Sequence, residues 1–378
     1  MATFVDQHLA WELTSIVLHD FEFQVKELTT ALRDYVESET PLYFAQRLTN
    51  HYNNSEGEGP EIYLKRGDLN HGGAHKINNA IAQAMIVKWM GRKSIVAAIG
   101  ARQHGVATAV ACTNLSLDCT IFMGATDMEK WTSNVLLIKH PGAEVEVVDG
   151  TFKDASSKAV KAWLGNLETK YYLVGTTLGP HPCPNMVREF QSIIGKETRK
   201  QAMEKWGGRP DILVACIGSG SNALGLFHEF IKDEDVRLIA VEAAGFGLDS
   251  GKHAVTLTKG DVDLYHGAMS NLLQDEEGQI LCPHFIGVGY VGPEVSFLKE
   301  TGWAEFHTTT DEAIVVAYIR LCHFEGIFPA LVASHAFAFL EKLCPTLPNG
   351  TKVLVNISGR GDKDAAIVFQ YQLDQLSD

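Results

Sequence analysis

The sequence has no apolar run long enough to cross a membrane, because a spanning helix needs about 20 consecutive apolar residues. Its N-terminus lacks a basic start and mixes acidic residues among the apolar ones, which is not the pattern of a signal peptide. Lys and Arg are spread thinly and the formal net charge is −14, so no cluster of cations is available for nucleic-acid phosphates. We therefore expect a cytoplasmic protein with no nucleic-acid partner and no membrane partner.

The cysteines also lack the spacing that is typical of disulfide-bonded or zinc-binding proteins. The seven cysteines are odd in number, and none belongs to a CxxC pair. Neither a disulfide framework nor a zinc site is expected, so we predict no metal centre and interpret most cysteines as buried free thiols. They lie at positions 112, 119, 183, 216, 282, 322 and 344.

Short apolar runs followed by glycine turns and helical patterns recur along the 378 residues. This alternation predicts an α/β fold with parallel sheets covered by helices on both faces, and the length fits two domains. Residues 245–280 show little periodicity and are predicted to form an ordered loop region. The predicted strands are 94–100, 119–124, 144–150, 171–175, 211–218, 236–245 and 352–361.

The first motif with chemical potential is LKRGDLNHGGAHKINNAIAQAM (64–85), in which a glycine pair precedes His75 and Lys76 at the start of a predicted helix. A helix N-terminus favours anions, so a lysine there is unexpected if its role is only structural. A desolvated lysine in a tight turn can instead form a Schiff base. A solvated surface lysine is the alternative.

The second motif is CIGSGSNALG (216–225), where a strand ends in glycines and serines before a helix begins. Backbone N–H groups exposed by glycine at a helix start form a phosphate cradle. The spacing matches neither dinucleotide nor nucleoside-triphosphate signatures. An ordinary glycine turn is the alternative.

The third motif, NISGRGDKD (356–364), leaves Ser358 at the carboxyl end of a strand, where ligands of α/β sheets bind. A neutral hydroxyl at this place could face a pyridine nitrogen. A plain turn is again the alternative.

In this order, the three motifs resemble the β-subunit of tryptophan synthase. The resemblance extends from about residue 39 to 370. It includes ETPLYFAQRLT (39–49), QHGVATAVA (103–111), GPHPCPNMVREFQSIIGKE (179–197), LDSGKHAVTLTKG (248–260) and EGIFPALVASHAFAF (325–339).

The resemblance implies a fold-type-II pyridoxal-phosphate enzyme made of two three-layer α/β/α domains. The implied first domain spans 76–190, with a mobile subdomain at about 91–175. The second spans 191–378 and receives part of 40–75, and 1–39 is a divergent N-terminal segment.

The resemblance also implies roles for individual residues. Lys76 would be the catalytic Schiff-base lysine, His75 a neighbour of the phosphate, Ser358 the partner of the pyridine nitrogen and Glu325 a neighbour of the cofactor ring. The phosphate would be held by Gly218, Ser219, Gly220, Ser221 and Asn222. The substrate loop would comprise Ala98, Ile99, Gly100, Ala101, Arg102, Gln103 and His104, with His104 interpreted as a residue that shapes the loop rather than a base.

The sequence departs from this family mainly on the acceptor side. Where the family has its catalytic glutamate, this chain has Ala98, which can neither protonate a leaving hydroxide nor contact an indole nitrogen. Ile99 replaces a threonine, and Arg102 replaces a glycine. The family's Arg–Asp pair that closes the site is also missing, because Lys130 replaces the arginine and the loop at 287–294 lacks the aspartate.

These features predict a β-replacement that joins serine, or an activated serine ester, to indole or an indole-like nucleophile. The product would be tryptophan or an analogue. Two alternatives remain: a shifted attacking atom that gives a tryptophan isomer, and a catalytically silent homologue that regulates a partner.

The resemblance further implies a homodimer and a possible monovalent cation beside pyridoxal phosphate. The missing closure pair and the divergent N-terminus suggest that the chain does not depend on an α-subunit. We therefore expect its partners to be an amino-acid donor and an aromatic acceptor.

Overall fold

The computed structural model describes residues 21–100, 103–130, 132–281, 283–284 and 289–377. Within it the chain forms two compact units. Unit 1 comprises residues up to 38, 70–175 and 181–183, and unit 2 comprises 39–69, 176–180 and 184 onward. The sequence-based boundary lay at 190/191, whereas residues 184–190 group with unit 2 and 70–75 with unit 1.

Unit 1 is built on a four-stranded parallel sheet in the order β5-β4-β3-β6. Its strands are β3 (Ser94–Ile99), β4 (Asp118–Gly124), β5 (Glu144–Val148) and β6 (Lys170–Tyr172). Its helices are α2 (Phe21–Asp34), η2 (His71–Gly73), α4 (Lys76–Trp89), α5 (Gln103–Asn114), α6 (Ala125–Lys130), α7 (Thr132–Lys139) and α8 (Phe152–Leu164).

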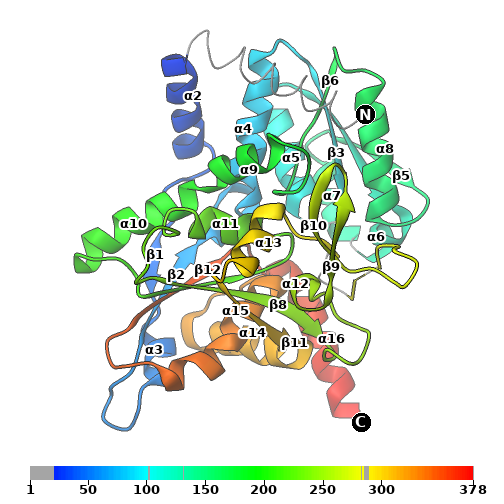
Figure 1. Ribbon diagram of the computed structural model, residues 1–378. Coiled ribbons are helices and arrows are strands. Elements are labelled where there is room, and N and C mark those ends of the chain that lie inside the picture. The colour runs from blue at the N-terminus through cyan, green and yellow to red at the C-terminus, as the bar shows by residue number, and fades with distance from the viewer. Residues whose placement is uncertain (1–20, 101–102, 131, 282, 285–288, 378) are drawn as a thin grey trace. The chain divides into compact units, whose positions relative to one another are not determined.

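Side chains of the unit 1 strands point alternately to the two faces of the sheet, and each face is covered by different helices. Ile99, Ile121 and Met123 share one face and pack in a cluster with Val106 of α5 and Ile138 of α7. Helix α8 packs on β3 and β4 and buries its own small residues. The predicted three-layer arrangement is therefore found in this unit (Figure 1).

Unit 2 contains a six-stranded sheet in the order β1-β2-β12-β7-β8-β11, parallel except for β1. The strands of this sheet are β1 (Leu42–Phe44), β2 (Glu61–Arg66), β7 (Ile212–Cys216), β8 (Arg237–Gly245), β11 (Glu305–Thr310) and β12 (Lys352–Ile357). Unit 2 also contains a separate two-stranded sheet of β9 (Asp261–Tyr265) and β10 (Ala268–Leu272). Its helices are α3 (Gln46–Tyr52), η1 (Gly67–Leu69), α10 (Ile193–Trp206), α11 (Ser221–Phe227), α12 (Thr256–Lys259), α13 (Pro293–Glu300), α14 (Asp311–Glu325), α15 (Leu331–Leu343), η3 (Cys344–Thr346), η4 (Asp362–Asp364) and α16 (Ala365–Ser377). Helix α9 (Cys183–Gln191) begins at the last residue of unit 1 and continues in unit 2.

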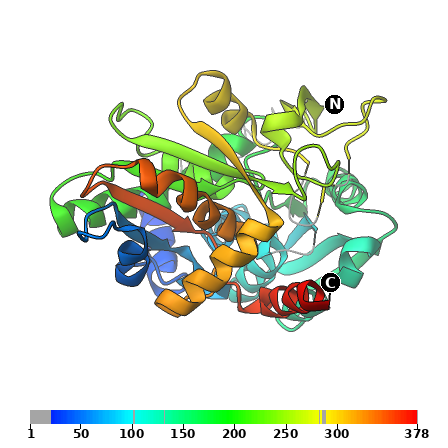
Figure 2. The ribbon, with the colours of Figure 1, turned by 90° about the horizontal axis from the view of Figure 1, so that it is seen from below.

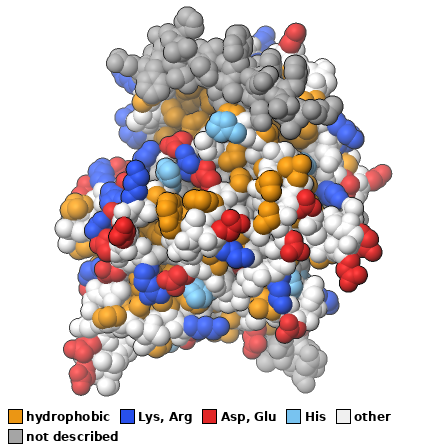
Figure 3. Space-filling view, viewed as in Figure 1, with side chains coloured by type: hydrophobic (Ala, Val, Ile, Leu, Met, Phe, Trp, Pro, Cys, Tyr) orange, Lys and Arg blue, Asp and Glu red, His pale blue; other side chains and the backbone are white. Residues whose placement is uncertain are grey.

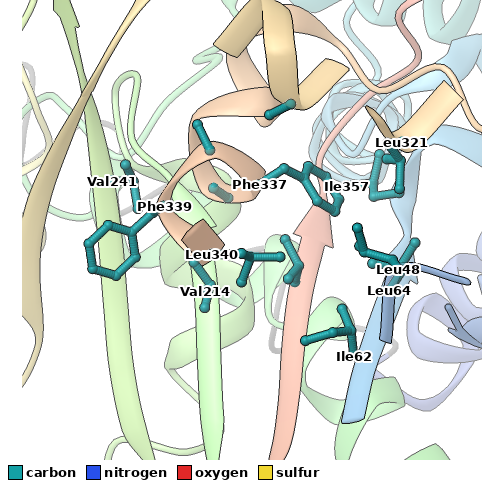
Figure 4. Close-up of a cluster of buried hydrophobic side chains, with 14 of the residues drawn as sticks. Leu48, Ile62, Leu64, Val214, Val241, Leu321, Phe337, Phe339, Leu340 and Ile357 are labelled. Carbon is teal, nitrogen blue, oxygen red and sulfur yellow. The ribbon is translucent and has the colours of Figure 1, made fainter. Parts of the chain in front are cut away.

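Two hydrophobic clusters fill the two faces of the unit 2 sheet, because successive side chains of a strand point to opposite faces. On β7, Ile212 and Val214 join α3, α14 and α15 (Figure 4), whereas Leu213 and Ala215 join α10, α11 and α13. Val368 of α16 belongs to the first cluster, and α16 lies beside α14 (Figure 2). The continuous apolar runs of the sequence thus reflect strands that are buried on both faces.

Some elements were not predicted from the sequence. Residues 245–280, expected to be loop, contain α12 and an antiparallel hairpin of β9 and β10. Four of the five residues of β9 are exposed, so the apolar periodicity that marks a buried strand is missing. The polar strand β11 was missed for the same reason, whereas the edge strand β1, with three residues, is too short to show a period.

No helix in the described ranges is both long enough and apolar enough to span a bilayer. Acidic and basic side chains are interspersed over the face drawn in Figure 3. This distribution agrees with the absence of cationic clusters in the sequence.

A buried ion pair fastens β2 of unit 2 to α10. Lys65 Nζ donates to Glu197 Oε2 at 2.7 Å, to the Thr40 carbonyl at 2.7 Å and to Gln201 Oε1 at 3.0 Å. The Lys65 side chain is only 1% exposed, so all three donors are satisfied inside the protein. Removing the carboxylate would leave a buried ammonium without its counter-charge.

We expect Glu197→Ala to lower the free energy of unfolding by about 3–5 kcal/mol, measured by urea denaturation. The double variant Lys65→Met/Glu197→Leu should recover most of this loss, because it removes both charges. Lys200→Ala, which breaks a surface pair with Glu39, is the control and should change the unfolding midpoint little. Equal effects of Glu197→Ala and Lys200→Ala would contradict the assignment.

Candidate active site

Lys76 is the first residue of α4 and follows a turn that requires glycine. Gly72 and Gly73 have φ values of 75° and 78°, where a side chain is strained. His75 is buried at the N-cap position, next to Lys76. The glycine pair recognised in the sequence thus shapes the turn that places Lys76 at the start of α4.

The Lys76 amine is held by a backbone carbonyl that the sequence did not single out. Nζ donates a hydrogen bond of 2.6 Å to the carbonyl oxygen of Gly175, three residues beyond the end of β6. The His104 ring packs on the same residue, since a Cβ at Gly175 would lie 2.4 Å from His104 Cδ2. Gly175 therefore serves both the lysine and the histidine. Its position at the carboxyl end of a predicted strand was the available signal.

The His104 imidazole is neutral at physiological pH. Both ring nitrogens are buried. Burial, and after it the positive charge of Lys76, lower the pKa of His104 to about 3. With this pKa the ring is a poor base, and its neutral form is only a very weak acid.

The first two residues of the predicted substrate loop, Ala98 and Ile99, belong to strand β3 and are buried. Ala98 is buried near the end of β3, directly opposite Phe122 of β4. Ile99, predicted to belong to the substrate loop, packs in the unit 1 core. A Cβ added to Gly105 would lie 2.6 Å from Ile99 Cδ1 and 2.7 Å from Ile138 Cδ1, so the Ile99 side chain fills the space beneath α5.

The other residues of this loop are only partly described. Gly100 follows β3 and lies near Phe152 and Asp127, both within 4 Å of a Cβ built on it. Gln103 and His104 begin α5. Ala101 and Arg102, both predicted to belong to the substrate loop, lie outside the described residues.

In unit 2, the glycine loop between β7 and α11 presents backbone donors that have no acceptor. Within the described part of the chain, the N–H groups of Gly218, Ser219 and Gly220 make no hydrogen bond. The loop is fixed from behind, because the Ser219 carbonyl accepts from the Gly292 N–H at 3.2 Å and from Thr176 Oγ1 at 3.4 Å. Such a rigid array of free donors is suited to an anion.

The two glycines of this loop have different tasks. Gly220 has a φ of 96°, and a Cβ there would lie 2.4 Å from Val295 Cγ2, so only glycine fits. A Cβ on Gly218 would meet nothing within 4 Å. The space beside Gly218 is therefore open to a ligand.

Side chains beneath the loop connect it to Ser358. Asn222 Nδ2 donates to the Cys216 carbonyl at 3.0 Å, and its Oδ1 accepts from Asn356 Nδ2 at 3.2 Å. Cys216 Sγ lies 3.7 Å from Ser358 Oγ. Ser358 and the loop thus share the carboxyl edge of the parallel strands β12 and β7, and the amide of Asn222, predicted to hold phosphate, supports the loop from within.

Glu325 has structural partners that the sequence did not reveal. At the end of α14, its carboxylate accepts from Tyr43 Oη at 2.7 Å and from the Leu48 N–H, in the first turn of α3, at 2.8 Å. A carboxylate at a helix N-terminus satisfies a free donor and complements the helix dipole. In this structure, both Glu325 oxygens are occupied in this way.

Comparison with known proteins identifies the family of this chain. A sequence profile described as "Pyridoxal-phosphate dependent enzyme" matches residues 34–359, which is most of the chain. This chain belongs to the pyridoxal-phosphate dependent enzyme family. Enzymes of this family use pyridoxal phosphate as their cofactor.

Solved structures with low sequence identity share the fold. A point mutant of O-ureido-L-serine synthase with O-ureido-L-serine bound has a TM-score of 0.64 at 18% identity, covering 91% of this chain and 97% of that one. The processed form of threonine deaminase isoform 2 from Solanum lycopersicum has a TM-score of 0.67 at 19% identity, covering 93% and 87%. Both confirm the expected fold-type-II architecture.

The described residues fit pyridoxal phosphate. The cofactor carries a phosphate, an aldehyde that reacts with an amine, and a pyridine nitrogen. The free N–H groups at 218–220 and the open space beside Gly218 suit the phosphate. In unit 1, the Lys76 amine could react with the aldehyde, and in unit 2, the Ser358 hydroxyl is a neutral group that could face the nitrogen. Within the described residues, no cluster of His, Cys, Asp and Glu side chains is arranged to hold a metal ion.

If the space beside Gly218 receives the phosphate, Gly218→Ala should fold normally but bind pyridoxal phosphate more weakly, by about tenfold or more. The apoprotein melting temperature should stay within error of wild type, because the added methyl meets no protein atom. Equilibrium dialysis measures the affinity.

Gly208→Ala, at a half-buried bend of the same unit where a Cβ would meet only Trp206 at 3.6 Å, is the matched control and should leave the affinity unchanged. Unaltered affinity in Gly218→Ala would show that the phosphate lies elsewhere.

Proposed function

We propose that this enzyme catalyses a β-replacement, joining an activated serine ester or serine to indole or an indole-like nucleophile. The observation that carries the proposal is the neutral Ser358 hydroxyl beside the glycine loop. A neutral partner leaves the pyridine ring a weaker electron sink than a carboxylate would, which favours elimination at Cβ. The resemblance to tryptophan synthase β-subunits and the fold shared with an O-ureido-L-serine synthase support the same substrate class.

Each part of the site would have a separate task. Pyridoxal phosphate, when bound, withdraws electrons from the α-carbon of an amino acid. Lys76 would hold the cofactor covalently, and its Nζ would take the proton from the donor Cα and later return it. The loop at 218–220 would anchor the phosphate, and Ser358 would hold the pyridine nitrogen in its neutral form.

The preference for an activated donor follows from Ala98. Hydroxide is a poor leaving group and departs only with a proton from an acid, which alanine cannot supply. His104 cannot replace that acid, because its imidazole is neutral. An acetate or phosphate ester leaves without this proton.

The test is to incubate the holoenzyme with indole and with serine, O-acetylserine or O-phosphoserine in turn, and to identify products by mass spectrometry and NMR. We expect kcat/KM to be at least about tenfold higher with an ester than with serine. Borohydride reduction should fix the cofactor on the peptide that contains Lys76, and Lys76→Ala should abolish both this label and turnover. Absence of a β-substituted product with every donor would contradict β-replacement.

Ala98 also supports a second product. In the related family, the glutamate at this position contacts the indole nitrogen and orients the ring. C3 is the most nucleophilic carbon of indole, so tryptophan is the default product. Without the contact, the ring can present C2 or N1, because orientation in a site can outweigh intrinsic reactivity.

The variant Ala98→Glu tests the regiochemistry. If loss of the glutamate released the ring, the wild type should form a tryptophan isomer, and Ala98→Glu should shift the product toward tryptophan in NMR spectra. Activity with free serine should rise in the same variant, because an acid is restored. Ala98→Gln, which restores size without an acid, is the control. A wild type that already forms only tryptophan would overturn the isomer hypothesis.

A further inference from the structure

The stretch of chain whose carbonyl accepts the hydrogen bond from the Lys76 amine is held in place by a side-chain amide. Strand β6 ends at Tyr172, and the last sheet hydrogen bond is donated by the Leu173 N–H to the Val96 carbonyl at 2.9 Å. At the next residue, Val174, the Gln83 side-chain amide provides the hydrogen bonds in place of a strand. Its Oε1 accepts from the Val174 N–H at 3.1 Å, and its Nε2 donates to the Val174 carbonyl at 2.8 Å. Gln83 thus pairs with Val174 as a neighbouring strand would.

The orientation of this amide is determined by its partners. A backbone N–H can only donate, so the Gln83 atom that faces the Val174 N–H must be the oxygen. Nε2 then donates to Asn79 Oδ1 at 2.7 Å, which directs Asn79 Nδ2 to the Val174 carbonyl at 2.8 Å. Gln83 and Asn79 are both fully buried. The network is fully bonded and has one consistent arrangement.

Helix α4 brings this network and the reactive amine to the same stretch of chain. Lys76, Asn79 and Gln83 are spaced by three and four residues, so they share one face of the helix. Asn79 and Gln83 fix Val174, and Lys76 Nζ donates to the carbonyl of the next residue, Gly175. A shift of Val174 would therefore move the acceptor of the amine.

We propose that Gln83 is a positioning residue that sets where the Lys76 amine rests between the two proton transfers at the donor Cα. The proposal rests on the proposed function, in which Lys76 moves that proton. Gln83 Oε1 also accepts from Tyr171 Oη at 3.3 Å, so Gln83 acts through this stretch of chain and Gly175 rather than on the donor itself. Its loss should therefore slow proton transfer and leave donor binding nearly unchanged.

The variant Gln83→Met keeps the length of the side chain and removes both of its polar atoms. In the holoenzyme we expect kcat to fall by about tenfold to a hundredfold, since small misplacements of a reacting group cost this much. KM for the donor should change by less than about twofold. Exchange of the donor Cα proton in deuterium oxide should slow as much as kcat.

Gln191→Met is the matched control. Gln191 is a fully buried glutamine of unit 2 whose amide has no hydrogen-bond partner among the described residues. This variant should keep wild-type kcat and exchange rate. Equal losses in Gln83→Met and Gln191→Met would mean that removing any buried amide has this effect.

A second measurement uses the apoprotein and does not depend on the reaction. Competitive acetylation with peptide mass spectrometry measures the reactivity of each lysine. In Gln83→Met, Lys76 should label several-fold faster than in wild type, because its carbonyl acceptor is no longer fixed. Exposed Lys88, on the same helix, is the internal reference and should not change.

The outcomes separate the two proposals. If Gln83→Met does not fold, Asn79→Ala removes one bond to Val174 and should increase Lys76 labelling to a smaller extent. Unchanged Lys76 labelling in the folded variant would overturn the role of Gln83 even if β-replacement holds. If the wild type gives no β-replacement product but Lys76 labelling still responds, the proposed function fails and the positioning of Lys76 by Gln83 remains.

Discussion

The hydrogen bond from Lys76 Nζ to the Gly175 carbonyl is the interaction around which unit 1 is organised. It needs the glycine turn before α4, which places the lysine at the helix start. It also needs an acceptor whose position does not vary, and the Gln83 and Asn79 amides provide this at Val174. The His104 ring packs on Gly175 and excludes a side chain there. A mobile amine is thereby given a defined position by rigid surroundings.

In unit 1 the protein itself provides the acceptor for the Lys76 amine. In unit 2 the glycine loop does the reverse, because an anion can bind only to donors that the protein leaves unpaired. Backbone N–H groups inside a protein are normally hydrogen-bonded, and these three, in two half-buried residues and one buried residue, are not. The loop tolerates this because its other contacts are complete: the Ser219 carbonyl accepts two hydrogen bonds, and the Asn222 amide is bonded on both sides. Bound phosphate would complete the hydrogen bonding of this loop.

The sequence predicted the parts of the fold that depend on local pattern. Continuous apolar runs such as 211–218 and 352–361 identified buried parallel strands, and glycines identified the turns. It could not predict the Gly175 contact, because 99 residues separate its partners. It also placed Ile99 in the substrate loop, whereas the side chain packs in the core of unit 1. Residues at a strand end can face the site or the core, and only the packing of α5 and α7 decides between them.

The position of Ile99 reduces the number of residue differences that support an altered acceptor. If Ile99 serves the core, its difference from the family's threonine is explained by packing with Ile138 and requires no change of substrate. Ala98 has no such explanation, because alanine removes volume and charge without filling a gap. The case for unusual chemistry therefore depends mainly on one lost carboxylate. That loss affects both protonation of the leaving group and orientation of the acceptor, so a change of donor and a change of product are expected to occur together.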